Sequence, residues 1–255
     1  MKKTKRSLTP ASRSKKKDII FFSDAHLGLG EPEEDRAREA TIIRFLRTVA
    51  SKAEHVFIVG DLFDYWFEYK TVIPKGHVRL LGALAELRDS GVGITYIAGN
   101  HDFWLRSFFP QELGIEVCLD PIDRLLYGKR FLIHHGDGLL KNDTGYRILK
   151  RVLRNKVNIF LFSLVHPDLT SWLARWSSRT SRAHTGKKVY EGNDMVDFAG
   201  RKLASGFDFV IMGHNHQSHT SKMNGGTYIN LGDWIDERTY ATFNGKSIRL
   251  RAFKG

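Results

Sequence analysis

Short apolar runs alternate with longer segments of helical spacing through the first part of the chain. Residues 19–23, 56–59 and 94–98 are apolar runs of strand length, whereas residues 33–52 and 78–87 repeat apolar side chains at the period of an α-helix. Strands that alternate with helices in this way are typical of layered α/β folds. The pattern therefore predicts an α/β domain built from successive strand and helix steps.

The rest of the chain divides into a helical middle and a strand-rich end. Between Gly138 and about Asp194 the apolar residues have helical spacing, which predicts an inserted helical cap over about 139–193. We expect one domain over 18–255 that carries this cap, preceded by a basic disordered tail over 1–17. Further short strands are predicted at 131–134, 209–212, 227–230, 240–243 and 247–251.

Composition is that of a folded protein with a basic arm. With 255 residues, of which 42% are apolar, the chain can bury a substantial core without a disulfide or metal. The formal net charge is +12, but residues 1–17 hold eight Lys or Arg and no acidic residue, so the remainder carries +4. Such an arm suits an anionic lipid surface or nucleic acid, and it equally suits a solvated tail.

Cysteine usage and apolar run lengths indicate a cytoplasmic protein. Cys118 is the only cysteine, so no intrachain disulfide can form, which fits a reducing compartment. The basic N-terminus is followed by only four consecutive apolar residues, too few for the core of a signal peptide. The longest apolar stretch elsewhere, residues 157–165, is far shorter than the roughly 20 residues that span a bilayer. We expect any membrane contact to be peripheral.

Five polar clusters follow predicted strands at the point where each strand ends. Loops at the carboxyl ends of strands are where α/β proteins place their sites, so these clusters can converge on one edge. The clusters are Ser23-Asp24-Ala25-His26, Gly60-Asp61-Leu62-Phe63-Asp64, Gly99-Asn100-His101-Asp102, His134-His135-Gly136-Asp137 and Gly213-His214-Asn215-His216.

The residue types in these clusters are those that bind transition metals. An Asp-x-His or His-x-His pair leaving a strand projects both side chains to one side, so both can grip one ion. Carboxylate, imidazole and amide ligands together suit Mn, Fe or Zn better than Ca or Mg. Two such ions roughly 3.5 to 4 Å apart can clamp a phosphate and generate a hydroxide nucleophile. A lone Asp or His is usually structural, but five clusters in this order favour a two-metal site.

The set as a whole resembles the calcineurin-like metallophosphoesterase superfamily over residues 19 to about 235. The resemblance implies an α/β fold, a four-layer α/β/β/α sandwich with two mixed sheets, and a dinuclear centre at the strand ends. The two divalent ions are most commonly Mn²⁺, with Fe or Zn as alternatives. It also implies that one ion takes Asp24, His26 and His216, that the other takes Asn100, His135 and His214, and that Asp61 bridges them.

Within that superfamily, four motifs resemble the UDP-2,3-diacylglucosamine hydrolases of lipid A biosynthesis. The implied reaction is attack of water on the α-phosphorus of a UDP-linked acylated glucosamine lipid, releasing UMP and 2,3-diacylglucosamine 1-phosphate (lipid X). The expected location is the anionic cytoplasmic face of the inner membrane. The hydrolases of this group usually have Gly-Asn-Arg-Asp, where this chain has His101 in place of the Arg. The motifs are Ser23–Gly28, Gly60–Trp66, His135-Gly136-Asp137 and Asn230–Trp234.

Several further residues are expected around the metals. His101 can protonate the leaving oxygen or stabilise charge in the transition state, or it is a structural residue held by Asp102. Asp143 aligns with a substrate-contacting aspartate of the hydrolases, with helix capping as its alternative role. We expect His101 and Asp61 to be catalytic, Asn100, His101, Asp143 and His214 to bind substrate, and Asp64, Asp102 and Asp137 to support the metal-ligating residues.

The predicted cap combines aromatic with basic residues. Such a surface suits a lipid, with rings at the headgroup level and cations for phosphate, although packing on the domain or a solvated face are the plainer explanations. The aromatic residues are Phe160, Phe162, Trp172 and Trp176, and the basic ones are Arg147, Lys150, Arg151, Arg154, Lys156, Arg175, Arg179, Arg182, Lys187 and Lys188.

Two other functional classes compete with the lipid hydrolase. A metallophosphodiesterase or nuclease of the same superfamily would act on another substrate, but the chain shows no recognisable nucleic-acid-binding module, which disfavours nucleic acid. A non-catalytic scaffold would typically have lost ligands, whereas all seven positions hold competent residues.

Overall fold

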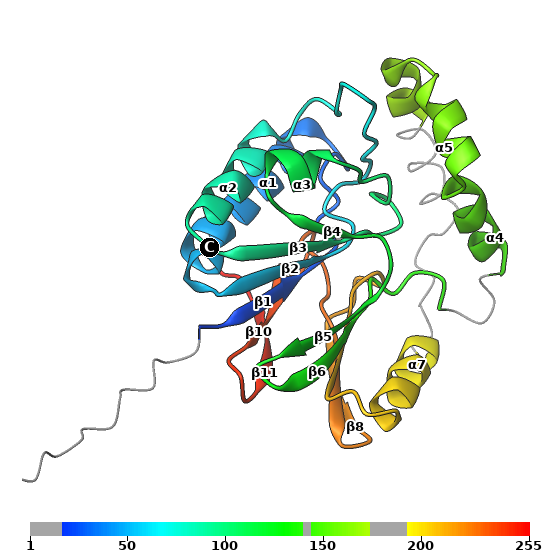
Figure 1. The fold of residues 1–255 in the computed structure, drawn as a ribbon. Coiled ribbons are helices and arrows are strands. Elements are labelled where there is room, and N and C mark those ends of the chain that lie inside the picture. The colour runs from blue at the N-terminus through cyan, green and yellow to red at the C-terminus, as the bar shows by residue number, and fades with distance from the viewer. Residues whose placement is uncertain (1–16, 140–143, 174–192) are drawn as a thin grey trace, which may run out of the picture.

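The computed structural model describes residues 17–139, 144–173 and 193–255. One mixed sheet has the order β11-β10-β1-β2-β3-β4, in which β1 to β4 pair in parallel and β10 pairs antiparallel with both β1 and β11. Figure 1 shows β1, β2 and β3 side by side beneath helices α1, α2 and α3. Their bounds are β1 Ile19–Phe22, β2 His55–Val59, β3 Gly93–Ile97, β4 Glu116–Cys118, β10 Thr239–Phe243 and β11 Ile248–Ala252.

A second mixed sheet has the order β5-β6-β7-β9-β8 and packs against the first. Its three central strands are parallel and its two edge strands are antiparallel. The bounds are β5 Ile122–Leu126, β6 Lys129–Ile133, β7 Phe209–Met212, β8 His219–Met223 and β9 Gly226–Asn230.

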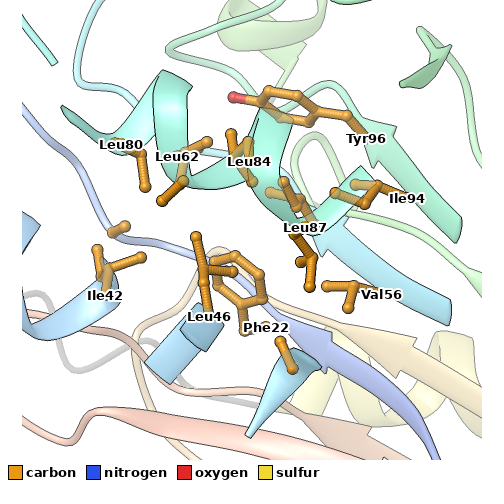
Figure 2. Packing of buried hydrophobic residues seen from close by; sticks show 14 of the residues in the cluster. Phe22, Ile42, Leu46, Val56, Leu62, Leu80, Leu84, Leu87, Ile94 and Tyr96 are labelled. Atoms are coloured by element: carbon orange, nitrogen blue, oxygen red, sulfur yellow. The ribbon is translucent and has the colours of Figure 1, made fainter. Parts of the chain in front are cut away.

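Helices cover the outer face of each sheet. The first sheet is covered by α1 (Pro32–Thr48), the short 3₁₀ helix η1 (Ala50–Lys52), α2 (Val78–Asp89) and α3 (Phe108–Glu112), and the second by α7 (Asn193–Ala204). Figure 2 shows Phe22, Val56 and Ile94 of the strands meeting apolar residues of α1 and α2. The four-layer α/β/β/α sandwich is therefore confirmed.

The inner layer between the sheets is built from the alternate residues of the same strands. Because successive side chains of a strand point to opposite faces, Phe22 packs on the helices while Phe21 points to the second sheet. There the Phe21 ring stacks on Phe57 at 5.1 Å and on Phe131 at 5.7 Å, and Phe131 stacks on Phe209 at 4.6 Å. This aromatic stack joins the two sheets.

The sequence patterns located most central strands but missed several peripheral elements. The helix predicted over 33–52 ends at Thr48, and a separate 3₁₀ turn follows over Ala50–Lys52. Strand β4 is only three residues long and β5 has no fully buried residue, so neither gives a strong apolar run. Helix α7 was also missed, although Met195, Ala199 and Leu203 repeat at helical spacing and are all buried.

The described part of the predicted cap is helical. It contains α4 (Thr144–Leu153), α5 (Lys156–Ser163) and a helical segment over 167–173. These helices stand beside the sandwich, next to the loops that follow the parallel strands (Figure 1). Over the described ranges, each helix is too short or too polar to cross a membrane.

We predict that Phe131→Ala destabilises the fold by about 3 to 5 kcal/mol, because it empties the centre of the inter-sheet stack. Leu125→Ala is the matched control, since Leu125 lies on neighbouring β5 but is 73% exposed; it should change stability by less than about 0.5 kcal/mol. Urea unfolding measures both. Similar losses for the two variants would contradict the assignment of the core to this layer.

Candidate metal centre

The five polar clusters meet at one edge of the sandwich, where parallel strands of both sheets end. Backbone hydrogen bonds join the loops within each sheet: the Asp24 amide donates to the Gly60 carbonyl at 3.1 Å, and the Gly213 amide donates to the His135 carbonyl at 2.8 Å. The two sheets are joined where the His214 amide donates to Asp24 Oδ2 at 2.9 Å. The predicted convergence is thus observed in the structure.

The backbone at this edge adopts left-handed conformations. An L residue with positive φ is uncommon, and Asp and His are among the residues that tolerate it best. Each such residue costs on the order of 1 to 3 kcal/mol, and these costs cluster at functional sites. The residues concerned are Asp24 (φ 56°), His26 (φ 44°), Asp61 (φ 53°), His214 (φ 74°) and His216 (φ 57°).

Two glycines allow these loops to approach one another. A Cβ on Gly99 would collide with the Asp61 carboxylate and amide, and a Cβ on Gly213 would collide with the side chains of Asp24 and Ser23. Glycine is therefore required here for close approach rather than for an unusual φ.

Asp61 lies at the centre of the cluster. Its Oδ2 is 3.2 Å from His135 Nε2 and 3.6 Å from His26 Nε2, so one carboxylate oxygen faces imidazoles on two sides. Its Oδ1 accepts a hydrogen bond of 2.9 Å from the backbone amide of His101. Asp61 is almost fully buried, which makes the orientation of both oxygens a fixed feature of the fold.

Asp24 lies beside His26 and His216 in the same cluster. Its Oδ1 lies 3.8 Å from His26 Nε2 and 3.7 Å from His216 Nε2, and those two nitrogens are 3.2 Å apart. Asp24 Oδ1 is buried and has no hydrogen-bond partner within the described ranges. A buried carboxylate oxygen in this state costs free energy unless a cation balances it.

The environment of His135 shows that the cluster is built from acceptors. Its Nδ1 lies 2.9 Å from the Val59 carbonyl oxygen, which can only accept, so Nδ1 carries the proton. Its Nε2 then faces Asn100 Oδ1 at 3.0 Å and Asp61 Oδ2 at 3.2 Å. Three groups with lone pairs turned toward one another require a shared cation, either a proton or a metal ion.

Two other histidines are oriented in the same way, by a contact between Nδ1 and an oxygen acceptor. His26 Nδ1 is 3.4 Å from Asp64 Oδ1, and His216 Nδ1 is 3.3 Å from Asp233 Oδ2. Metal-binding histidines usually place one ring nitrogen on a carboxylate or carbonyl, which directs the other toward the ion. His26, His135 and His216 all have this arrangement, with Nε2 turned inward.

The carboxylates and imidazoles also shift one another's ionisation. Burial opposes the charged form of Asp61, but the charges of His135 and His101 outweigh it and hold the pKa of this carboxyl well below its usual range. Burial lowers the pKa of His26, but the nearby carboxylates of Asp24 and Asp64 reverse this and raise it to about 9. The carboxylates therefore draw positive charge to the nitrogens that face them.

The donor atoms fall into groups that suit more than one ion. Within the described ranges, three sets of atoms each lie within 4.8 Å of one another: Asp24, His26 and His216; His26, Asp61 and His101; and Asp61, His135 and His214. Asn100 adjoins the third set through His135. All seven residues expected to ligate metal are thus brought together, and their mixed oxygen and nitrogen donors fit divalent transition-metal ions.

The residues expected to support the cluster have distinct positions. Asp64 contacts two histidines, because its backbone oxygen lies 3.1 Å from His101 Nδ1 and its Oδ1 lies 3.4 Å from His26 Nδ1. Asp102, considered as the partner of His101, instead fixes the loops: it accepts hydrogen bonds of 2.8 Å from the backbone amides of Leu62 and Gly99. Burial, with the nearby charge of Asp61, raises the pKa of Asp102 to about 6.

Some contacts were not foreseen from the sequence. The Tyr96 hydroxyl donates to Asp102, and Lys150 Nζ of α4 lies 2.6 Å from Asp137 Oδ2. A tyrosine within an apolar strand was the available signal for the first contact, whereas the second joins elements that only the fold brings together. Asp143 and Trp176 lie outside the described residues.

A cavity of about 300 Å³ lies at the other end of the strands and involves none of these residues. It is lined in part by His55, Thr95 and Glu116, which are already joined in a chain of 2.8 Å contacts. The polar groups of these three residues therefore contact one another, unlike Asp24 Oδ1 in the metal-ligand cluster, which has no hydrogen-bond partner within the described ranges.

Known proteins resemble this chain over most of its length. A UDP-2,3-diacylglucosamine hydrolase of Porphyromonas gingivalis is 34% identical, with 92% of this chain and 97% of that protein covered. One from Ectopseudomonas mendocina is also 34% identical, covering 92% and 98%. Among solved structures, an archaeal phosphodiesterase is 15% identical with a TM-score of 0.48, covering 92% of this chain and 99% of that one. The sequence profile of calcineurin-like phosphoesterases matches residues 17–218. The chain belongs to the calcineurin-like phosphoesterase family.

Proposed function

We propose that this chain hydrolyses the pyrophosphate bond of UDP-2,3-diacylglucosamine, giving UMP and 2,3-diacylglucosamine 1-phosphate. The observation that carries the chemistry is the position of Asp61 Oδ2 between His135 Nε2 and His26 Nε2, at 3.2 and 3.6 Å. The substrate is supported by the relatives, which bear the name of this hydrolase and align over nearly their full lengths.

Two divalent ions fit the donor atoms of the cluster. We assign Asp24, His26 and His216 to one ion and Asn100, His135 and His214 to the other, with Asp61 shared. When bound, such ions polarise the phosphoryl oxygens and lower the pKa of the attacking water. Manganese is our preferred metal, since mixed carboxylate, amide and imidazole donors suit it, and iron or zinc suits them too.

The buried carboxylates let the chain hold this positive charge. Asp24 and Asp61 are both fully enclosed, and their charges lie beside His26, His135 and His216. In a site of low effective dielectric constant their attraction for cations is stronger than in water. The same enclosure positions a phosphate at the open side of the cluster, where Asn100 and His101 are only half-buried.

His101 is placed to move a proton. Its ring is 26% exposed, and its Nδ1 lies 3.1 Å from the Asp64 carbonyl oxygen, an acceptor that fixes the proton on Nδ1. Proton exchange with a substrate then falls to Nε2. We assign His101 the transfer of a proton to the leaving phosphate oxygen of 2,3-diacylglucosamine 1-phosphate, a role that an arginine at this position would not perform.

The substrate is tested by comparing three compounds with the purified, metal-loaded protein: UDP-2,3-diacylglucosamine, a bis-nitrophenyl phosphate and duplex DNA. We expect UMP and the lipid phosphate as products of the first, with far lower kcat/KM on the DNA. Asp61→Ala should lose several orders of magnitude in kcat on every substrate, since it removes the carboxylate shared by both ion positions. Efficient DNA cleavage without UDP-lipid hydrolysis would replace this proposal with a nuclease.

We predict that His101→Ala lowers kcat by roughly 10²- to 10⁴-fold while both metal ions stay bound. The reason is that His101 is assigned to proton transfer, whereas seven other side chains hold the ions. Kinetics on the UDP-lipid together with elemental analysis check this, with His219→Ala, an exposed residue of β8, as control. Loss of metal along with activity would give His101 a ligating or structural role instead.

We also propose that the cap helices rest on the anionic membrane surface. Large apolar side chains are exposed on α5, at the residue that follows it and on 167–173; they include Phe160 at 59%, Leu164 at 68% and Trp172 at 57%. The basic residue Lys156 lies on α5, and Arg147 lies on the neighbouring helix α4. An exposed apolar face beside cations is what an interfacial protein needs, and the basic arm over 1–17 would add attraction.

Phe160→Ser and Trp172→Ser should weaken binding to vesicles that contain anionic lipid by about threefold or more, with little change in Tm. In contrast, Phe162→Ala should lower Tm, because Phe162 stacks on Trp104 at 5.0 Å and packs on Phe67 at 4.9 Å. Val78→Ser, at a 74% exposed position of α2, is the control for exposed apolar area. Vesicle sedimentation and thermal melts measure these effects. Equal vesicle binding by all four variants would remove the membrane role of the cap.

A further inference from the structure

Helix α4 is attached to the sandwich mainly by polar contacts. Its apolar residues Ile148, Leu149 and Val152 are 57%, 51% and 48% exposed, so apolar packing contributes little to its position. Instead, the Leu153 carbonyl accepts from Trp104 Nε1 at 3.2 Å, and Arg154 donates to the Leu119 carbonyl at 2.9 Å. Few buried apolar contacts are typical of an element with low local stability.

A further attachment is an ion pair between α4 and a loop that carries a proposed metal ligand. Lys150 Nζ lies 2.6 Å from Asp137 Oδ2, and Asp137 follows the proposed ligand His135 by two residues. The Asp137 side chain is 3% exposed and the Lys150 side chain 25% exposed, so the pair is largely shielded from water. Charged hydrogen bonds of this kind are short and stronger than neutral ones.

Two of the residues that contact α4 or its C-terminal end lie in loops that carry proposed metal ligands. Trp104 lies just after Asn100 and His101 in the loop that follows β3, and Asp137 lies just after His135 in the loop that follows β6. Lys150 pairs with Asp137, and the guanidinium of Arg154, directly after α4, lies 5.6 Å from the ring centroid of Phe103 in the loop that follows β3. The C-terminal end of α4 therefore contacts the same loops that carry proposed metal ligands.

We propose that the ion pair between Asp137 and Lys150 is a positioning contact that sets the cap at a fixed place relative to the metal cluster. Lys150 acts through Asp137 and α4, not on the reacting atoms. A substrate long enough to touch both the metals and the cap depends on this placement, whereas a small phosphodiester that touches only the metals does not. The consequence for the UDP-lipid rests on the proposed function above; the placement of α4 does not.

The kinetic test compares Lys150→Ala, Lys150→Arg and the matched control Arg151→Ala, an exposed cation at the next position of the same helix. With the metal-loaded full chain, Lys150→Ala should raise KM for UDP-2,3-diacylglucosamine roughly tenfold, as expected for loss of a partly shielded charge pair. Turnover of bis-nitrophenyl phosphate should stay within about twofold of wild type. Lys150→Arg, which keeps the charge, should recover most of the KM, and Arg151→Ala should behave as wild type.

Amide hydrogen exchange provides a second readout that needs no substrate. Lys150→Ala should speed exchange of the α4 amides over 144–153 by about tenfold while leaving β2 and β7 unchanged, and Arg151→Ala should not. Unchanged α4 exchange, or equal kinetic losses on both substrates, would overturn the positioning role. If wild-type protein does not hydrolyse the UDP-lipid, the proposed function fails, and the exchange experiment alone decides whether the ion pair places the cap.

Discussion

The structure depends on the confinement of the Asp61 carboxylate between imidazoles from both sheets. Asp61 comes from the first sheet and His135 from the second, with 3.2 Å between their facing atoms. Two buried lone-pair donors at this distance repel each other unless positive charge lies between them. A cation between them would neutralise this repulsion, so charge neutralisation favours closure of the functional edge and also serves the proposed chemistry.

This constraint explains why the edge departs from ordinary backbone geometry. Asp24, His26 and Asp61 adopt positive φ, and Gly99 leaves no room for a Cβ because the Asp61 side chain occupies it. A regular strand continued past Phe22 would keep Asp24 and His26 on one face but separate them by roughly 7 Å along the strand. The left-handed turns bring the Asp and His side chains close together. The buried aromatic layer between the sheets supports the strands from which these loops extend.

The sequence was most informative where function and local structure coincide. The apolar runs before Asp24, Asp61 and Asn100 predicted both the strands and the place where the polar residues would meet, because parallel strands end at a common edge. Peripheral elements such as β4 and α7 were missed because β4 has only three residues and because the apolar residues of α7 are interspersed with polar ones. The hydrogen-bond partners of Asp102 could not be predicted from the sequence either. The loop amides that donate to a carboxylate depend on the φ and ψ angles of the loop, which no residue pattern specifies.

The position of Asp64 links catalysis to metal binding through one residue. Its carboxylate lies 3.4 Å from His26 Nδ1, and its carbonyl oxygen lies 3.1 Å from His101 Nδ1. The first contact orients a proposed ligand, and the second orients the proposed proton donor, so a shift of this loop would disturb both together. An arginine in place of His101 would bring a permanent charge and several donors, which could stabilise a phosphate without any such orientation. A histidine can transfer a proton, but only if its ring is correctly oriented. The Asp64 carbonyl oxygen orients the His101 ring, and Asp64 lies in the same loop as Asp61.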